Sequence, residues 1–236
     1  MNITKSVTAI ALATTLASLA APVAAQQPNP AGFYLGAGLG AGRASWNDGD
    51  FDVTGSLNSE ASSLGLAPLF SGGLSKDTTA FGYKLFAGYR INQYFGVEGG
   101  WAYLGKFDFN GNFAYSGVPV GSASGDYKGS SWNLALVGRY PFGNGFSVQG
   151  KLGAAFTTAE LSYSISASNP AFAAINDSGT EKKNKTNVLW GLGAGYDFTP
   201  NLGMLVEYEN FGTLGDSDTT GRVRMALWSA SLLYKF

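Results

Sequence analysis

Charged side chains that could do chemistry stand at intervals in segments made mostly of apolar residues and glycine. Glu207 and Glu209 are two residues apart, a spacing that could suit paired-carboxylate acid–base catalysis. The chain has no histidine and no cysteine, which removes the commonest general base, the commonest metal ligand and all thiol chemistry. No catalytic set, metal site or cofactor is therefore expected. The charged positions of interest are Lys84, Arg90, Glu98, Lys106, Arg139, Lys151, Glu207 and Glu209.

Two other short motifs carry weaker signals. The segment WNDGDFDV places Asp48, Asp50 and Asp52 in a D-x-D-x-D rhythm that could bind Ca²⁺, although no glutamate completes an EF-hand loop. The basic run EKKNK at 181–185 could contact acidic sugars or phosphates of lipopolysaccharide. A solvated loop is the simpler explanation of both motifs, so neither decides the function.

The charged residues stand on segments that alternate in character with period two, which is typical of β-strands. In FGVEGGWAYLGKF (95–107), Trp101 and Tyr103 fall on one face, while Glu98 and Lys106 fall on the other. The segments have about the length of 9–11 residues that a tilted strand needs to cross a membrane. Eight such segments are predicted, at 33–42, 80–91, 95–107, 130–142, 146–157, 187–198, 202–211 and 224–236.

The composition indicates that these strands cross a membrane. Only 13% of the residues are charged, about half the usual share in soluble domains, and 34 of 236 are glycine. A spanning chain without long apolar helices must form a closed barrel, because every backbone polar group needs a partner in lipid. We therefore predict an all-β fold, an eight-stranded antiparallel transmembrane β-barrel with up-and-down meander topology. Its aromatic face points to lipid, and its charged, glycine-rich face points into the lumen.

The connections between the strands alternate between short and long. Three of them are three-residue turns, and a turn with an odd number of residues keeps the predicted inner positions of both strands on one face. Short turns are expected on the periplasmic side and long loops outside the cell. The turns are predicted at 92–94, 143–145 and 199–201, and the loops at about 43–79, 108–129, 158–186 and 212–223.

Charges inside a narrow barrel must pair with one another or reach water. Counted from the periplasmic turns, Glu98 and Arg139 stand equally far along neighbouring strands, so we predict that they pair, with Lys151 and Glu207 nearby. Such a network either fills and stiffens the barrel or gates a narrow, intermittently open pore, and the sequence leaves both interpretations open. The predicted network comprises Lys84, Arg90, Glu98, Arg139, Lys151, Glu207 and Glu209.

Residues 1–25 have the features of a secretory signal peptide: Lys5, then an apolar run, then small residues at Val23 and Ala25. We expect cleavage after Ala25 and a mature barrel over 26–236. The overall net charge of −1 offers no basic surface for a nucleic-acid partner. A signal peptide followed by a barrel predicts a bacterial outer-membrane protein, surrounded by lipid and lipopolysaccharide, with both termini of the barrel periplasmic.

Three hairpin sequences are distinctive: YKLFAGYRINQYFGVEGGWAYLGKF, LVGRYPFGNGFSVQGKLGAAF and GLGAGYDFTPNLGMLVEYENFG. They resemble the hairpins of the OmpA-type transmembrane domain and of the small surface barrels of the opacity-protein type. The resemblance implies that Glu98, Lys151 and Glu207 match members of an internal charge cluster in that family. Val137 and Gly38 stand where the family has other members of the cluster, so a thinner or rearranged network is expected here.

For function, the resemblance implies a non-enzymatic barrel that supports the envelope and displays four surface loops to host cells, phage or lipopolysaccharide. It also implies that LLYKF, ending on Phe236, is the signal that the barrel-assembly machinery reads. The long members of the family carry a peptidoglycan-binding domain after the barrel, and we expect none here. A narrow, porin-like diffusion pore is the alternative. A lipid-modifying enzyme ranks third, because barrels that act on lipid A depend on histidine, which this chain lacks.

Overall fold

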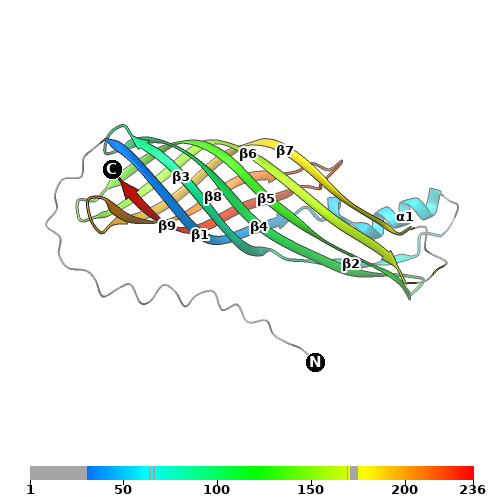
Figure 1. Cartoon of the computed structure of the whole chain (residues 1–236). Helices are drawn as coiled ribbons and strands as arrows, with labels where there is room; N and C mark the ends of the chain where they lie inside the picture. Colours follow the sequence, from blue (N-terminus) through cyan, green and yellow to red (C-terminus); the bar gives the residue numbers. More distant parts are fainter. Residues whose placement is uncertain (1–30, 64, 66, 169, 171–174) are drawn as a thin grey trace, which may run out of the picture.

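The computed structural model describes residues 31–236 apart from 64, 66, 169 and 171–174, so the predicted signal peptide lies outside the described residues. Eight strands of the described part form a closed antiparallel ring, which the pairing of β1 with β9 completes (Figure 1). The predicted up-and-down barrel is therefore confirmed. The strands of the ring are β1 (Gly32–Trp46), β3 (Thr79–Arg90), β4 (Phe95–Tyr115), β5 (Val118–Pro141), β6 (Phe146–Ala167), β7 (Asp177–Asp197), β8 (Leu202–Leu214) and β9 (Val223–Lys235).

The three predicted short turns lie at one end of the barrel, where the C-terminal end of β9 also lies (Figure 1). Each turn is closed by the same contact, in which an N–H after one strand donates to the carbonyl of the first residue of the next strand. We identify this end as periplasmic, because short turns of outer-membrane barrels face the periplasm. The donor and acceptor pairs are Ile91–Phe95, Phe142–Phe146 and Phe198–Leu202, each at 2.9 Å.

The alternation along the strands places the faces as predicted. On β5, Trp132, Leu134 and Leu136 are exposed on the outside of the barrel, whereas Ala135 and Val137, which alternate with them, are buried. An apolar outer band is what lipid requires of a barrel. Near the periplasmic turns the exposed residues are mostly aromatic, as in the interfacial girdles of such barrels: Tyr94, Phe95, Tyr140, Phe142, Phe146, Phe198, Tyr234 and Phe236.

A β-bulge in β4 reverses the two faces of that strand. The pairing of β4 with β5 shifts register between Tyr103 and Gly105, and Gly105 has a φ of +121°, which other residues rarely adopt. Even-numbered residues of β4 face the lumen before the bulge, and odd-numbered residues do so after it. The prediction that Lys106 faces the lumen and Phe107 faces lipid is therefore wrong. Phe107 is fully buried, and the Lys106 side chain is 48% exposed.

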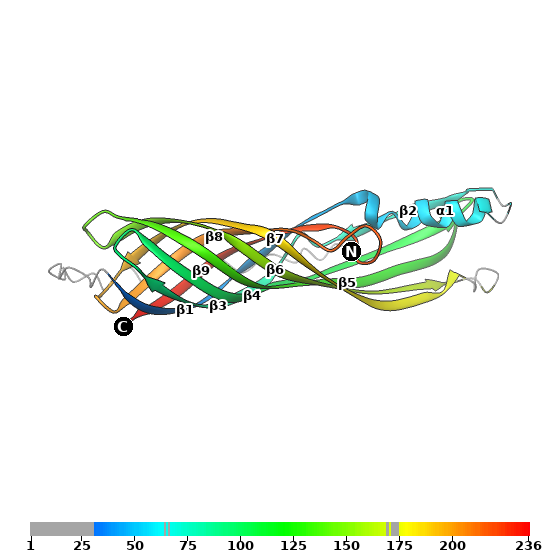
Figure 2. The same ribbon diagram turned by 90° about the horizontal axis from the view of Figure 1, so that it is seen from above.

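Beyond the barrel, β4 to β7 continue past the other strands and form a second structure (Figure 2). A short strand, β2 (Phe70–Lys76), pairs with the outer part of β4. We call β2 and the parts of β4 to β7 within 108–129 and 158–186 the outer sheet. The prediction that these two ranges are loops is wrong for most of their length, because β4 pairs with β5 and β6 with β7 almost to the hairpin tips. Their polar composition indicates loops, but small polar residues form strands where the backbone is fully paired.

One end of the outer sheet is covered by helical segments (Figure 2). The helix η1 (Asp48–Phe51) is followed by α1 (Val53–Ser63), so the predicted loop 43–79 contains two helices and a strand. Leu57 and Ala61 are one turn apart on α1, and both are buried. Among the described residues, no helix is long and apolar enough to cross a membrane.

Candidate functional site

Five of the seven predicted network residues meet in one cluster inside the lumen. Lys84 comes from β3, Glu98 from β4, Lys151 from β6, and Glu207 and Glu209 from β8. Each of these side chains is at most 5% exposed. The five residues, which we call the lumen network, connect strands from opposite sides of the ring.

The ions of the lumen network are paired with one another. The Lys151 ammonium lies 3.1 Å from carboxylate oxygens of both Glu207 and Glu209, and it also contacts Glu98. The Lys84 ammonium lies 2.6 Å from Glu209 and contacts Glu207. Two lysines thus hold three glutamates, and each buried charge has a partner that offsets its desolvation.

Neutral groups complete the lumen network. The Tyr34 hydroxyl donates to Glu98 at 3.1 Å, and the Gln149 amide donates to Glu207 at 2.8 Å. Glycine supplies the space for these long side chains, because a Cβ atom on Gly193 would lie 2.5 Å from Cγ of Glu207. The glycine-rich inner face that is visible in the sequence is therefore what allows the charges to meet.

Arg139 belongs to a different group, nearer the periplasmic turns. Its Nη2 lies 2.9 Å from Asp197, and the other oxygen of Asp197 lies 2.8 Å from the Lys235 ammonium. The predicted Glu98–Arg139 pair is therefore wrong. The strand register explains the error, because Glu98 pairs across the strands with Ala135, four residues from Arg139. Tilted barrel strands are staggered, so equal distances from a turn do not mean equal heights.

Asp197 and Lys235 are not among the predicted network residues, although the sequence contains a signal for both. Both are odd-numbered, and the odd-numbered residues of β7 and β9 face the lumen. Arg90, the remaining predicted residue, lies with its guanidinium 5.5 Å from the centre of the Tyr34 ring, a cation–π contact. The charged lumen residues therefore form two ion-paired groups, and Arg90 contacts the lumen network through the Tyr34 ring.

Beyond the lumen network, on the side away from the turns, the lumen is filled by apolar side chains. The predicted charged and glycine-rich interior is wrong for this half of the barrel. The bulge turns Phe107 inward, and the inner positions of β8 and β9 become apolar at Phe211 and Leu227. We call the following fully buried residues the apolar plug: Leu104, Phe107, Leu189, Phe211, Met225 and Leu227.

A small cavity lies between the lumen network and the periplasmic turns. It has a volume of about 20 Å³, and its lining includes Tyr34, Arg90, Glu98 and Arg139. That volume suits about one water molecule. Chemically, the lumen network ties β3, β4, β6 and β8 together by ion pairs.

Phe236, the predicted assembly signal, stands at the seam where the barrel closes. Its N–H donates to the carbonyl of Phe33 at 3.0 Å, which extends the pairing of β9 with β1. The residue is 65% exposed, and its ring packs edge-on against Tyr234, with 5.0 Å between ring centres. The ring is accessible from outside the barrel.

The three acids of the D-x-D-x-D motif do not converge. Asp48 lies 2.8 Å from Lys76, Asp50 lies 2.7 Å from Arg222, and Asp52 accepts from the first turn of α1. Hydrogen bonds from the Arg222 guanidinium lower the pKa of Asp50, so this carboxyl is charged at neutral pH. In the part of the chain that the structure describes, no three His, Cys, Asp or Glu side chains are grouped to hold a metal ion.

The basic run at 181–185 lies on the outer part of β7 and has acidic neighbours. Lys182 lies 2.8 Å from Glu160 on β6, and Lys183 contacts Asp216. Hydrogen bonds from Lys183 and Thr219 lower the pKa of Asp216 to about 2. The charge of these lysines is thus partly balanced within the protein.

Comparison with known proteins agrees with the fold. The model of the OmpA-like transmembrane domain matches residues 28–236. Outer membrane protein A of Yersinia pseudotuberculosis is 29% identical over 230 residues, and that of Salmonella typhi is 26% identical over 230 residues. Each alignment covers 97% of this chain and 55% of the relative, so the chain spans about half the length of these curated relatives.

Among solved structures, Ail, the attachment invasion locus protein of Yersinia pestis, aligns with a TM-score of 0.47 and 20% sequence identity. The alignment covers 87% of this chain and 99% of Ail. The family match extends over the whole ring of strands. The chain therefore belongs to the OmpA-like transmembrane domain family, and its location is the bacterial outer membrane.

Proposed function

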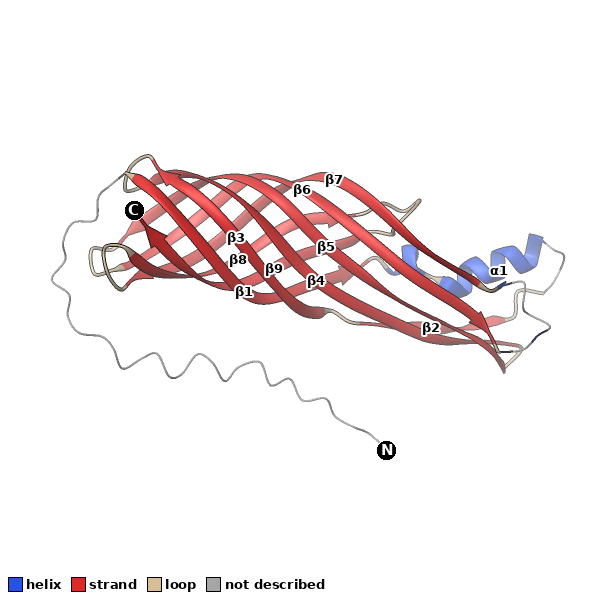
Figure 3. Cartoon of the chain, viewed as in Figure 1, coloured by secondary structure: helices blue, strands red, loops and turns tan. Residues whose placement is uncertain are grey.

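We propose that the protein is a non-enzymatic barrel that supports the cell envelope and displays the outer sheet to the surroundings of the cell. The contrast between its two parts carries this proposal. The lumen is filled by the lumen network and the apolar plug, whereas the wall continues beyond the membrane as the outer sheet with α1 beside it (Figure 3). The part of the chain beyond the membrane thus forms an external surface, and the lumen does not form an open channel.

Charged residues on the outer face, just beyond the lipid-facing aromatic residues, support a contact with lipopolysaccharide. Lys128 lies 3.0 Å from Glu160, which lies 2.8 Å from Lys182 on the next strand. Trp132 and Phe156 face lipid on the same strands, four residues nearer the periplasmic turns than Lys128 and Glu160. Ammonium groups at this border are placed to attract the phosphates of lipid headgroups.

The other proposed partners use different surfaces. The barrel-assembly machinery would read the exposed ring of Phe236 at the seam. A ligand on a host cell would bind the outer sheet, because this is the part of the described chain that extends farthest from the membrane (Figure 2).

Excision of residues 48–76 tests the display function. A glycine–serine link can join Asn47 to Asp77, since the Trp46 Nε1 donates to the Asp77 carbonyl at 2.8 Å and the two chain ends are adjacent. We expect bacteria with the wild-type protein to attach to epithelial monolayers several-fold better than bacteria with the excised protein. Heat-dependent gel mobility checks that both barrels are folded. Equal attachment by two folded barrels would exclude β2 and the helical segments from the adhesive surface.

A narrow pore is the second candidate function, and the buried charges of the lumen network are the observation that favours it. The apolar plug opposes it, because an ion would have to pass side chains that are fully buried and apolar. We expect no steady conductance from the wild-type protein in planar bilayers. The double variant Phe107→Ala/Leu227→Ala is the comparison, and openings seen only there would identify the plug as the barrier. Steady conductance of the wild type would favour the pore.

A further inference from the structure

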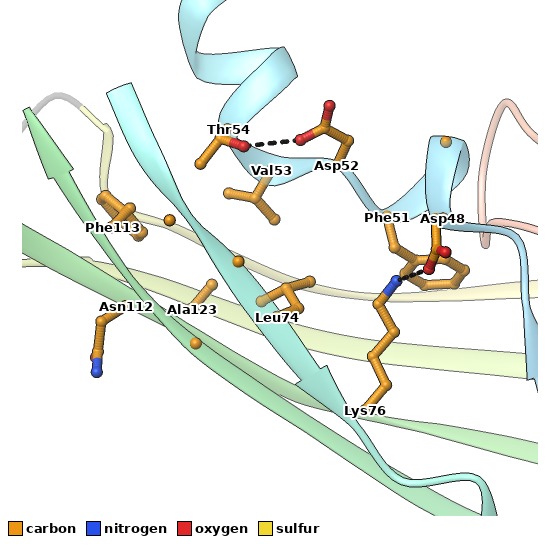
Figure 4. A pocket seen from close by; sticks show the side chains of 14 residues that line it. Asp48, Phe51, Asp52, Val53, Thr54, Leu74, Lys76, Asn112, Phe113 and Ala123 are labelled. Carbon is orange, nitrogen blue, oxygen red and sulfur yellow. Dashed lines mark hydrogen bonds and ion pairs between the residues drawn. The ribbon is translucent and has the colours of Figure 1, made fainter. Parts of the chain in front are cut away.

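A cavity lies between the helical segments and the outer sheet (Figure 4). Its lining shares no residue with the lumen network or the apolar plug. Its volume is about 420 Å³, within the range of about 300–1,000 Å³ that is typical of small-molecule sites. Glycines at Gly72, Gly73 and Gly111 line it, so this part of the sheet carries no side chains that would fill the space. Asp52 fixes the helix above the cavity, because its Oδ1 accepts from the Gly55 N–H at 2.9 Å.

About half of the cavity wall is apolar, and polar groups such as Asn112 form the rest. Val53 projects into it from the start of α1, and Leu74 and Ala123 project from the sheet (Figure 4). Phe113 closes one end, and both Phe113 and Ala123 are buried in the small core beneath α1. These apolar side chains therefore fit the hydrocarbon part of a ligand.

The opposite end of the cavity holds a single, well-positioned cation. The Lys76 side chain is only 13% exposed, and its ammonium lies 5.5 Å from the centre of the Phe51 ring. Its carboxylate partner, Asp48, is 2.8 Å away, but the Asp48 side chain is 93% exposed. Asp48 can therefore turn into solvent without losing buried contacts, whereas Lys76 cannot.

We propose that this cavity binds a small linear amphiphile with one anionic head, such as a medium-chain carboxylate. The tail lies along Val53, Leu74 and Ala123, and the head replaces Asp48 at the Lys76 ammonium. One ammonium matches one negative charge, and a charged hydrogen bond in a partly buried site is among the stronger polar contacts. A cationic head would face Lys76, and the two carboxylates of the lining are already engaged, Asp48 with Lys76 and Asp52 with the first turn of α1. This site is independent of the adhesion proposed above, because its ligand is a small molecule.

Methyl NMR of the full chain in lipid nanodiscs, titrated with decanoate, tests the site. We expect saturable shifts of the Val53, Leu74 and Ala123 methyl groups. The Leu134 methyl groups face lipid and report decanoate that only partitions into the bilayer. Octanoate should bind about tenfold more weakly, the effect expected for two fewer buried methylenes. Shifts confined to Leu134 would overturn the proposal.

Two substitutions with opposite expected effects separate the head group from the tail. Lys76→Met keeps most of the apolar stem and should weaken decanoate binding at least about tenfold, while decanol binding is unchanged. Asp48→Asn removes the competing carboxylate at an exposed position, so it should tighten decanoate binding. Lys182→Met on the outer face is the control and should change neither. If Asp48→Asn weakened binding, or if decyltrimethylammonium bound as well as decanoate, the assignment of an anionic head would be wrong.

Discussion

Lys151→Met will lower the free energy of unfolding of the barrel by about 3–5 kcal/mol, the loss that follows when one partner of a buried ion pair is removed. Lys151 contacts Glu98, Glu207 and Glu209 in a part of the lumen with almost no access to solvent. Without it, three carboxylates share the single ammonium of Lys84. Urea unfolding in lipid vesicles, followed by tryptophan fluorescence, measures the change.

Lys182→Met is the matched control for this measurement. It also removes a lysine from an ion pair, but the Lys182 side chain is 65% exposed beside Glu160. An exposed pair of this kind contributes about 0–1 kcal/mol, because water screens it and the side chains lose entropy when they pair. If both substitutions had the same small effect, the lumen network would not stabilise the barrel in the way the contacts indicate.

Leu134→Arg will destabilise the folded barrel in a bilayer by about 2–4 kcal/mol, the cost of a cation on the lipid face near the midplane. Leu134 is 59% exposed on the outer face of β5, between residues that face the lumen. This substitution tests the side assignment itself, on which the lumen network and the apolar plug both depend. Urea unfolding in lipid vesicles, followed by tryptophan fluorescence, measures this change in the free energy of unfolding as well.

Ser122→Arg is the control on the same strand. Ser122 has the same parity as Leu134, so it lies on the same face of β5, but it belongs to the outer sheet beyond the lipid-facing band. A surface substitution there should change stability by less than about 0.5 kcal/mol. Equal losses at the two positions would mean that Leu134 does not face lipid.

Local patterns in the sequence were enough to predict the barrel. The period-two alternation around Trp132, Leu134 and Leu136 assigns one face to lipid, and the three-residue turns carry that assignment from strand to strand without a change of parity. Lys84 and Glu98 are even-numbered positions opposite the apolar faces of their strands, so this alternation alone predicts that both are buried. These features depend only on neighbours along the chain, so they could be read without knowing how the strands are staggered.

Which groups touch across the lumen was decided by the tertiary structure. Glu98 pairs with Lys151 rather than Arg139, because tilt and stagger set the height of each strand in the ring. The bulge at Gly105 exchanges the sides of Lys106 and Phe107, since one extra residue reverses a period of two. The outer sheet and the cavity beside Lys76 likewise depend on pairings between distant segments, and such pairings leave little trace in a local pattern of glycine, serine and asparagine.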